Sequence, residues 1–195
     1  KADAERKYGS ATRTIKNEAY FGKAGLAWGV NNSIGFAVKA VPAGCVFADI
    51  GPNFQPKENA SLFKWSGFLN SLRTKMILRL FQSGDRGRFM WIANIVEQIP
   101  CPSDSGLAGC AEPAKRATQI FLKECSGDDC SPVFVRPTTE LCGGAPTLWS
   151  AYEDILAHHK DRERELLQLC SGIDNVVDAA FNRAFSDAEG IRALI

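Results

Sequence analysis

The sequence lacks the signals that would place a protein in a membrane or outside the cell. It has no run of about 18 apolar residues and no signal-peptide pattern of basic start, apolar middle and small-residue cleavage site. Its seven cysteines are an odd set without a Cys-X-X-Cys pair, which suits neither a zinc site nor a complete disulfide framework. We therefore expect a cytoplasmic chain with reduced thiols, no metal and no membrane partner.

Residues with catalytic chemistry are also scarce. The two histidines, His158 and His159, are neighbours in a charged helical stretch, where their side chains point about 100° apart and a solvated face is the simplest interpretation. Glycines 22 and 25 do not form a nucleotide loop, because no strand precedes them and no helix follows. The sequence therefore predicts no catalytic residue, and a cysteine enzyme ranks far behind the other functions.

The chain is nearly neutral as a whole but basic in one place. Its 195 residues are 45% hydrophobic, enough for the core of one domain, and 23 Lys and Arg face 22 Asp and Glu. Between residues 64 and 88 the only acid is Asp85, against six bases: Lys64, Arg73, Lys75, Arg79, Arg86 and Arg88. Such a cluster is typical of phosphate binding, and a solvated helix face explains it about equally well.

Three short runs near the start of the chain predict strands. Residues 25–30, 34–41 and 45–50 are rich in Val, Phe, Trp and Ile, and the turn formers "NNS" and "PAG" separate them. We expect an antiparallel meander. The segment 51–59 then breaks the sheet with Gly51, Pro52 and Pro56.

Helical periodicity dominates the rest. Apolar residues at intervals of three and four predict one amphipathic helix over 59–81, capped by Asn59 or Ser61, and a second over about 113–123. Between them, 89–102 reads as a strand or extended segment, and 133–136 reads as a short strand.

The C-terminal part reads as a long helix that Thr147 caps. A seam of apolar residues follows it: Trp149, Tyr152, Leu156, Leu166, Cys170, Ile173, Val177 and Ala180. The charged run "HHKDRERE" at 158–165 interrupts this seam, so we expect about two turns to project into solvent or to meet something outside the chain. The fold class is therefore α+β: a small antiparallel sheet packed with amphipathic helices, with a long C-terminal helical segment.

Several segments, taken in order, resemble a known family. "GLAWGVNNSIGFAVKAVPAGCVFADIGP", the "LNS" of residues 69–71 and "WIANIVEQIPCP" resemble the region after the catalytic domain in bacterial N6-adenine DNA methyltransferases. The similar proteins are the BREX-type enzymes of phage defence and the fused restriction-modification enzymes. The positions that match the motifs are Trp28, Gly35, Phe36, Lys39, Pro42, Gly44, Ile99, Pro100 and Pro102, and the tail "IDNVVDAAFNRAFSDAEGI" extends the resemblance to about residue 191.

The sequence departs from the family in ways that bear on function. Gly29 stands where a serine is common, and Ala180 and Phe181 stand at leucine and tyrosine places. The (N/D)-P-P-(Y/F) tetrapeptide that holds the flipped adenine is missing, as is the glycine-rich S-adenosylmethionine loop. The resemblance therefore implies a non-catalytic target-recognition region without a cofactor of its own, with S-adenosylmethionine bound by the parent enzyme.

The resemblance also implies a domain plan and partners. Residues 1–20 would be a linker from a missing catalytic domain, 21–145 the target-recognition domain, and 146–195 a C-terminal helical segment. The expected partners are double-stranded DNA and the catalytic methyltransferase domain of the same chain. The expected DNA-binding residues are Trp28, Asn31, Asn32, Ser33, Lys39, Lys64, Arg73, Lys75, Arg86 and Arg88.

Two alternatives stay open. Asn31, Asn32 and Ser33 are turn formers, so an architectural role explains them about as well as base contacts do. A protein-interaction or oligomerisation module that uses the C-terminal helices is the rival to DNA recognition.

Overall fold

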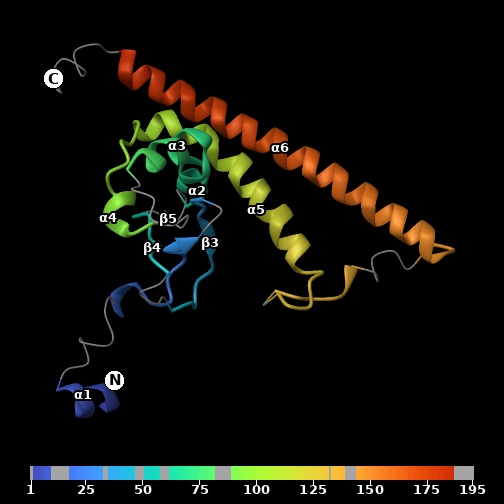
Figure 1. Cartoon of the computed structure of the whole chain (residues 1–195), viewed down its shortest axis with the longest axis horizontal. Helices are drawn as coiled ribbons and strands as arrows, with labels where there is room; N and C mark the ends of the chain where they lie inside the picture. The colour runs from blue at the N-terminus through green and yellow to red at the C-terminus, as the bar shows by residue number, and fades with distance from the viewer. Residues whose placement is uncertain are drawn as a thin grey trace.

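Short strands and a few helices alternate before one very long helix (Figure 1). The computed structural model describes residues 2–9, 18–32, 35–46, 51–57, 62–81, 89–131, 133–138 and 144–186. The strands are β1 (Gly25–Ala27), β2 (Asn31–Asn32), β3 (Lys39–Val41), β4 (Asn53–Phe54) and β5 (Phe89–Met90). The α-helices are α1 (Ala2–Tyr8), α2 (Leu62–Asn70), α3 (Leu72–Leu80), α4 (Ala93–Val96), α5 (Ala111–Cys125) and α6 (Leu148–Ser186), with 3₁₀ turns η2 (Glu18–Tyr20) and η4 (Asp104–Cys110). The expected α+β class is confirmed.

The main sheet is antiparallel, but its order is not that of a meander. β1 lies in the middle, between β3 and β4, with Leu26 opposite both Ala40 and Phe54. Of the expected third strand, residues 45–46 are not in a strand and 47–50 lie outside the described residues. β4 takes the edge position instead, inside the segment that was expected to break the sheet. Pro52 is tolerated there because an edge strand has one side without ladder hydrogen bonds.

A second, two-residue ladder extends from the main sheet. β2 pairs antiparallel with β5, which places Asn31 opposite Met90 and Asn32 opposite Phe89. We call β2 and β5 the ribbon. The backbone N–H of Trp91 donates to the carbonyl of Val30 at 2.7 Å and continues the pairing toward the core. Most of the expected extended segment 89–102 is not strand, since α4 follows Ile92.

The single helix expected over 59–81 is two helices. Ser71 between them has extended backbone, with φ −62° and ψ 151°. Its hydroxyl donates to the carbonyl of Phe68 at 2.8 Å and accepts from the N–H of Thr74 at 3.3 Å. Ser71 therefore ends α2 and caps α3, which the apolar periodicity across the break conceals. The two proposed caps, Asn59 and Ser61, lie outside the described residues.

The helices of the second half follow their sequence signals more closely. α5 contains the expected 113–123, and the N–H of Ser150 donates to the hydroxyl of Thr147 at 3.1 Å, which confirms the cap of α6. Residues 133–136 form a turn rather than a strand, because the N–H of Val135 donates to the carbonyl of Ser126 at 2.9 Å, just after α5 ends.

α6 packs on the body with its C-terminal half and forms an arm with its N-terminal half (Figure 1). Ile173, Val177 and Phe181 are buried in the same core as the sheet, so the core continues across the expected boundary at residue 146. The charged run 158–165 does not simply project into solvent, because it pairs with α5. Arg162 contacts Glu124 at 2.8 Å, and Arg116 contacts Glu165 at 2.6 Å, so α5 and α6 run antiparallel along the arm.

Candidate nucleic-acid interface

The ribbon rests on a floor of aromatic side chains. Trp28 is buried, its ring packs against Phe36 with centroids 5.9 Å apart, and its indole N–H donates to the carbonyl of Trp91 at 2.7 Å. Trp91 in turn stacks on Phe89 of β5 at 5.5 Å. Trp28 therefore supports the ribbon from beneath and presents no surface for DNA contact.

The outer face of the ribbon carries Asn31 and Met90. Both side chains are exposed, and residues directly opposite each other in an antiparallel ladder lie on the same face. An amide and an apolar side chain thus stand next to each other at the surface. The side chain of Asn32 and all of Ser33 lie outside the described residues.

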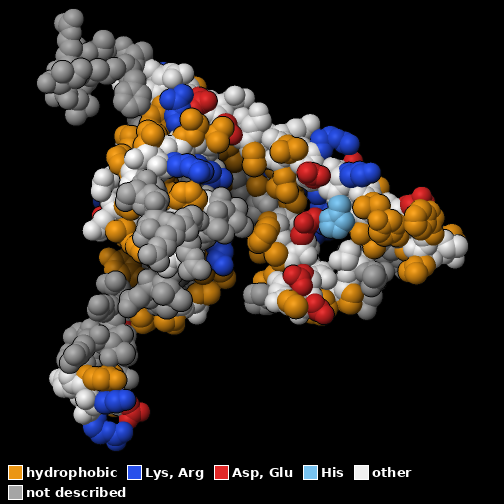
Figure 2. Space-filling model, viewed as in Figure 1, with side chains coloured by type: hydrophobic (Ala, Val, Ile, Leu, Met, Phe, Trp, Pro, Cys, Tyr) orange, Lys and Arg blue, Asp and Glu red, His pale blue; other side chains and the backbone are white. Residues whose placement is uncertain are grey.

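Basic residues of α3 lie beside the ribbon. The guanidinium of Arg79 stands over the ring of Phe89 at 4.8 Å, which places a positive charge next to β5. Lys75 lies one turn earlier and is half-buried, and no described acidic residue forms an ion pair with either base. Arg86 and Arg88 lie in the undescribed segment between α3 and β5. Figure 2 shows blue side chains in the region of α3.

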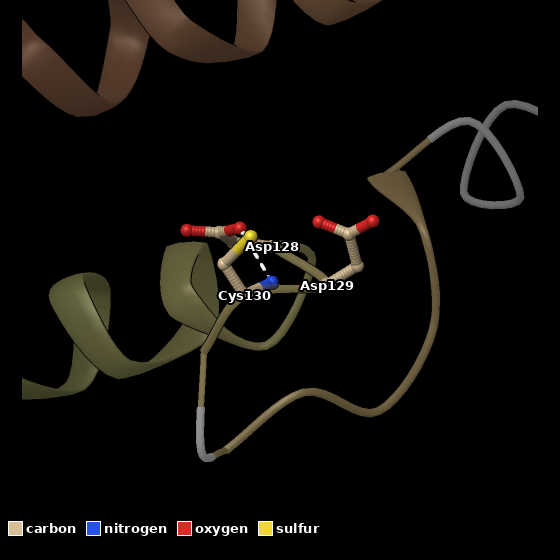
Figure 3. A group of neighbouring side chains, drawn as sticks. All are labelled: Asp128, Asp129 and Cys130. Atoms are coloured by element: carbon tan, nitrogen blue, oxygen red, sulfur yellow. Dashed lines mark hydrogen bonds between the residues drawn. The ribbon is translucent and has the colours of Figure 1, made fainter.

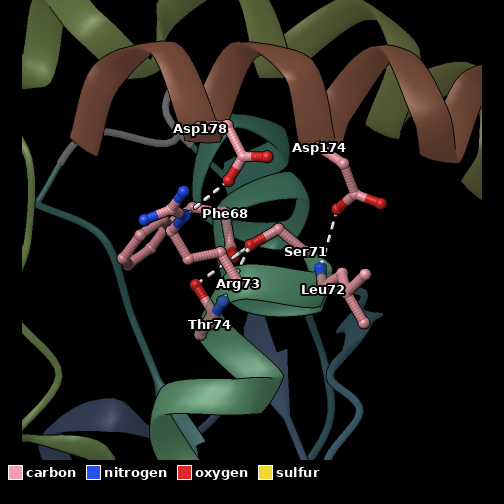
Figure 4. A network of polar contacts seen from close by, with 7 residues as sticks. All are labelled: Phe68, Ser71, Leu72, Arg73, Thr74, Asp174 and Asp178. Atoms are coloured by element: carbon pink, nitrogen blue, oxygen red, sulfur yellow. Dashed lines mark hydrogen bonds and ion pairs between the residues drawn. The ribbon is translucent and has the colours of Figure 1, made fainter. Parts of the chain in front are cut away.

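The other expected bases are placed differently. Lys39 is exposed on the edge strand β3, and the ammonium of Lys64 on α2 lies 5.6 Å from the ring of Trp65. Arg73 points to α6, where its Nε donates to Asp178 at 2.5 Å (Figure 4). Its guanidinium also covers the ring of Phe181 at 5.5 Å. The charge of Arg73 is therefore already balanced, and this residue belongs to the contact between α3 and α6.

That contact has a second polar link. The backbone N–H of Leu72, the first residue of α3, donates to the carboxylate of Asp174 at 2.7 Å (Figure 4). Asp174 therefore satisfies a helix-terminal N–H that has no partner within α3, and a negative charge near a helix N-terminus is favourable. α6 orients α3, and through it the bases beside the ribbon.

Sequence reasoning missed the role of Asn70, although the "LNS" motif contains it. Its Oδ1 accepts from the N–H of Val38 at 3.0 Å, and its Nδ2 donates to the carbonyl of Val38 at 2.9 Å. One side chain thus replaces a strand partner for the segment before β3. The signal was the position of an asparagine at a helix end, where its side chain can reach backbone groups of another segment.

The buried cysteine Cys110 does not have the properties of a nucleophile. Cys110 is buried between α2 and α5, and desolvation together with the nearby charge of Asp174 raises the pKa of its thiol to about 11. It is therefore a neutral thiol at physiological pH and serves packing.

A turn after α5 gathers Asp128, Asp129 and Cys130 (Figure 3). Their ligand atoms lie within 4.8 Å of one another, and the N–H of Cys130 donates to the carboxylate of Asp128 at 3.0 Å. All three residues are exposed, and a structural zinc or calcium site needs at least four ligands. We assign no metal to this turn.

The neighbouring cleft, about 350 Å³, lies between the end of α5 and the arm of α6. Glu124 at its wall already accepts from Arg162 at 2.8 Å and lies 3.4 Å from Nδ1 of His159. Glu124 is therefore already paired within the protein, and we assign no ligand to this cleft.

No protein-family model matches this chain, and no curated protein matches its sequence. Among the helices that the structure describes, none has both the length and the hydropathy that a membrane span requires.

Proposed function

We propose that this chain is the target-recognition part of an N6-adenine DNA methyltransferase and that it has no catalytic activity of its own. The observation that carries the proposal is that three residues from the motifs of the resemblance lie around one surface feature. Trp28 and Phe36 support the ribbon, and Asn70 of "LNS" holds the strand segment beside it. Residues from segments that are far apart in the sequence thus pack beneath or beside the same ribbon, which supports a role for the ribbon in recognition.

The ribbon would read bases through Asn31. An asparagine amide can donate to N7-side acceptors and accept from the N6 amino group of adenine at once, and an apolar neighbour such as Met90 suits a thymine methyl group. A two-stranded ribbon is narrow enough to enter the major groove. The catalytic domain of the parent enzyme would flip the adenine and bind S-adenosylmethionine.

Phosphate contacts would come from the bases around the ribbon. Lys75 and Arg79 on α3 are the first candidates, because Arg79 lies over Phe89 of the ribbon. Lys39 on β3 and Lys64 on α2 are the other described candidates. Because Arg73 is paired with Asp178, it contributes structure rather than phosphate affinity in this proposal.

A salt series with duplex DNA tests the proposal. We expect the anisotropy of a labelled duplex to report binding that weakens steeply between about 50 and 200 mM salt, since each phosphate contact releases counterions. Lys75→Ala should weaken all duplexes alike and reduce the salt slope by roughly one. Lys115→Ala, an exposed base on α5, is the control and should bind like the parent. A chain that binds no duplex at low salt would refute the proposal.

A protein-interaction module is the second candidate. The observation that favours it is the apolar surface at the N-terminal end of α6, where Leu148, Trp149 and Tyr152 are exposed. Exposed aromatic side chains of this kind are common in binding surfaces.

A further inference from the structure

One row of apolar side chains on α3 points away from the core. Leu72, Met76 and Leu80 follow one another at intervals of four residues, and Met76 and Leu80 are 61% and 84% exposed. Residues at this interval form one ridge of a helix. Thr74 and Leu78 already fill the core side of α3, so burial against the described part of the chain does not explain the row. We call these three residues the α3 ridge.

A matching row lies on the arm of α6. Leu148, Tyr152 and Leu156 also recur at intervals of four, and Leu148 and Tyr152 are 88% and 50% exposed. Trp149 packs beside Tyr152 with ring centroids 5.5 Å apart. We call Leu148, Tyr152 and Leu156 the α6 ridge. Figure 2 shows hydrophobic side chains at this end of the arm. Two ridges of this type pack into each other's grooves at a crossing angle of about −50°.

The charges that border the two ridges are complementary. α3 has no acidic residue, and besides Arg73, which is paired with Asp178, it carries Lys75 and Arg79. The turns that carry the α6 ridge, residues 148–157, contain Glu153 and Asp154 and have no Lys or Arg. Opposite charges at the rim of an apolar contact favour one partner and one orientation.

The length of α6 allows two copies to satisfy both ridges at once. Tyr152 and Asp174 are 22 residues apart on α6, about 33 Å at 1.5 Å per residue, and Asp174 contacts the first residue of α3. If two α6 helices run antiparallel about a two-fold axis near residue 163, the α6 ridge of each copy reaches the α3 region of the other. Both ridges are then covered, so the assembly closes as a dimer and does not grow further.

We propose that this chain forms a two-fold dimer in which the α6 ridge of each copy packs on the α3 ridge of the other, with Glu153 and Asp154 facing Lys75 and Arg79. The occupant of the exposed arm is therefore a second copy of the chain. This inference does not rest on the proposed role in DNA recognition.

Sedimentation velocity of the whole 195-residue chain without DNA tests the dimer. We expect a monomer–dimer equilibrium that Leu80→Asp and Leu148→Asp each weaken by about tenfold or more. Phe121→Asp is the matched control, because Phe121 on α5 is 59% exposed and belongs to neither ridge, and it should leave the equilibrium unchanged. Circular dichroism and thermal unfolding check that each variant is folded, which we expect for such exposed positions.

Charge reversal tests the pairing of the two surfaces. Glu153→Lys with Asp154→Lys should weaken the dimer, and adding Lys75→Glu with Arg79→Glu should restore it. A chain that is monomeric at all concentrations overturns the proposal. So does a dimer that ignores Leu80→Asp and Leu148→Asp, or a charge-reversed quadruple variant that stays as weak as the first pair. Since no DNA is present, each of these failures leaves the DNA-binding result to be judged separately.

Discussion

At the scale of the residue, Asn70 holds the backbone of Val38 through both polar atoms of its side chain. Asn70→Ala leaves the N–H and the C=O of Val38 without their partners in a half-buried place. We expect the free energy of unfolding to fall by about 2–4 kcal/mol, measured by urea denaturation. Asn70→Asp keeps the acceptor and loses the donor, so its free energy of unfolding should lie between those of the parent and Asn70→Ala. Equal stability of Asn70→Ala and the parent would show that the segment before β3 does not depend on this side chain.

Because of Cys110, we expect the free energy of unfolding to change with pH in the alkaline range. The native state holds the thiol proton more tightly than the unfolded chain, since the pKa rises from 9.0 to about 11 on burial. The stabilisation is therefore complete below about pH 9 and is lost as the pH rises toward about 11. Between pH 8 and pH 10 we expect the free energy of unfolding to fall by about 1 kcal/mol more in the parent than in Cys110→Ala. Parallel pH curves for the two proteins would contradict this.

At the scale of the element, α2 passes close to the junction of η4 and α5 at Gly67. A Cβ at Gly67 would lie 2.9 Å from the Cβ of Cys110 and 3.1 Å from its carbonyl oxygen, so the helices must separate to admit it. We expect Gly67→Ala to lower the free energy of unfolding by about 1–3 kcal/mol in thermal unfolding. Gly172→Ala on α6 is the matched control, because its Cβ would meet nothing within 4 Å. The control should be about 0.5–1 kcal/mol more stable than the parent. Destabilisation by both changes would mean that the tight crossing is not the cause.

At the scale of the whole molecule, the proposed reading of bases is tested in the proposed parent enzyme. If the full-length protein is an adenine methyltransferase, Asn31→Ala with Asn32→Ala should relax or abolish its recognition motif when modified adenines are mapped genome-wide. Each lost bidentate contact is worth about 1–3 kcal/mol of discrimination. Asn94→Ala, an exposed asparagine on α4, should leave the motif unchanged. An unchanged motif in a folded Asn31/Asn32 variant would assign the ribbon to architecture.

DNA binding and dimer formation are both proposed to use α3. Lys75 contacts phosphates in the first proposal and acidic residues of the second copy in the other. We therefore expect a short duplex to reduce the dimer fraction in sedimentation. The monomeric Leu148→Asp variant should bind duplex more tightly than the parent at concentrations where the parent is dimeric. A duplex that binds dimer and monomer equally would show that the two surfaces do not overlap.

Much of the local structure could be predicted from the sequence, because its causes are local. The periodicity of 113–123 and the cap at Thr147 depend on residues within a few positions, and α5 and α6 confirm them. The break at Ser71 was missed because the apolar pattern continues across it. The order β3-β1-β4 was missed because strand pairing depends on distant residues and not on the pattern within each strand.

In the candidate site, too, some properties follow from neighbouring residues and others from the packing of distant ones. The sequence by itself determined that positive charge gathers between residues 64 and 88 and that two asparagines follow a segment with Trp28, because these are properties of neighbouring residues. The asparagines were expected in a turn, but the structure places them in strand β2, since pairing with the distant β5 decides their backbone. Only the tertiary structure decided which of these side chains are available. Trp28 is held by a residue 63 positions away, and Arg73 is neutralised by one 105 positions away. Contacts over such distances arise from packing of the whole chain, so they set the exposure and the charge of each side chain without leaving a trace in the local sequence.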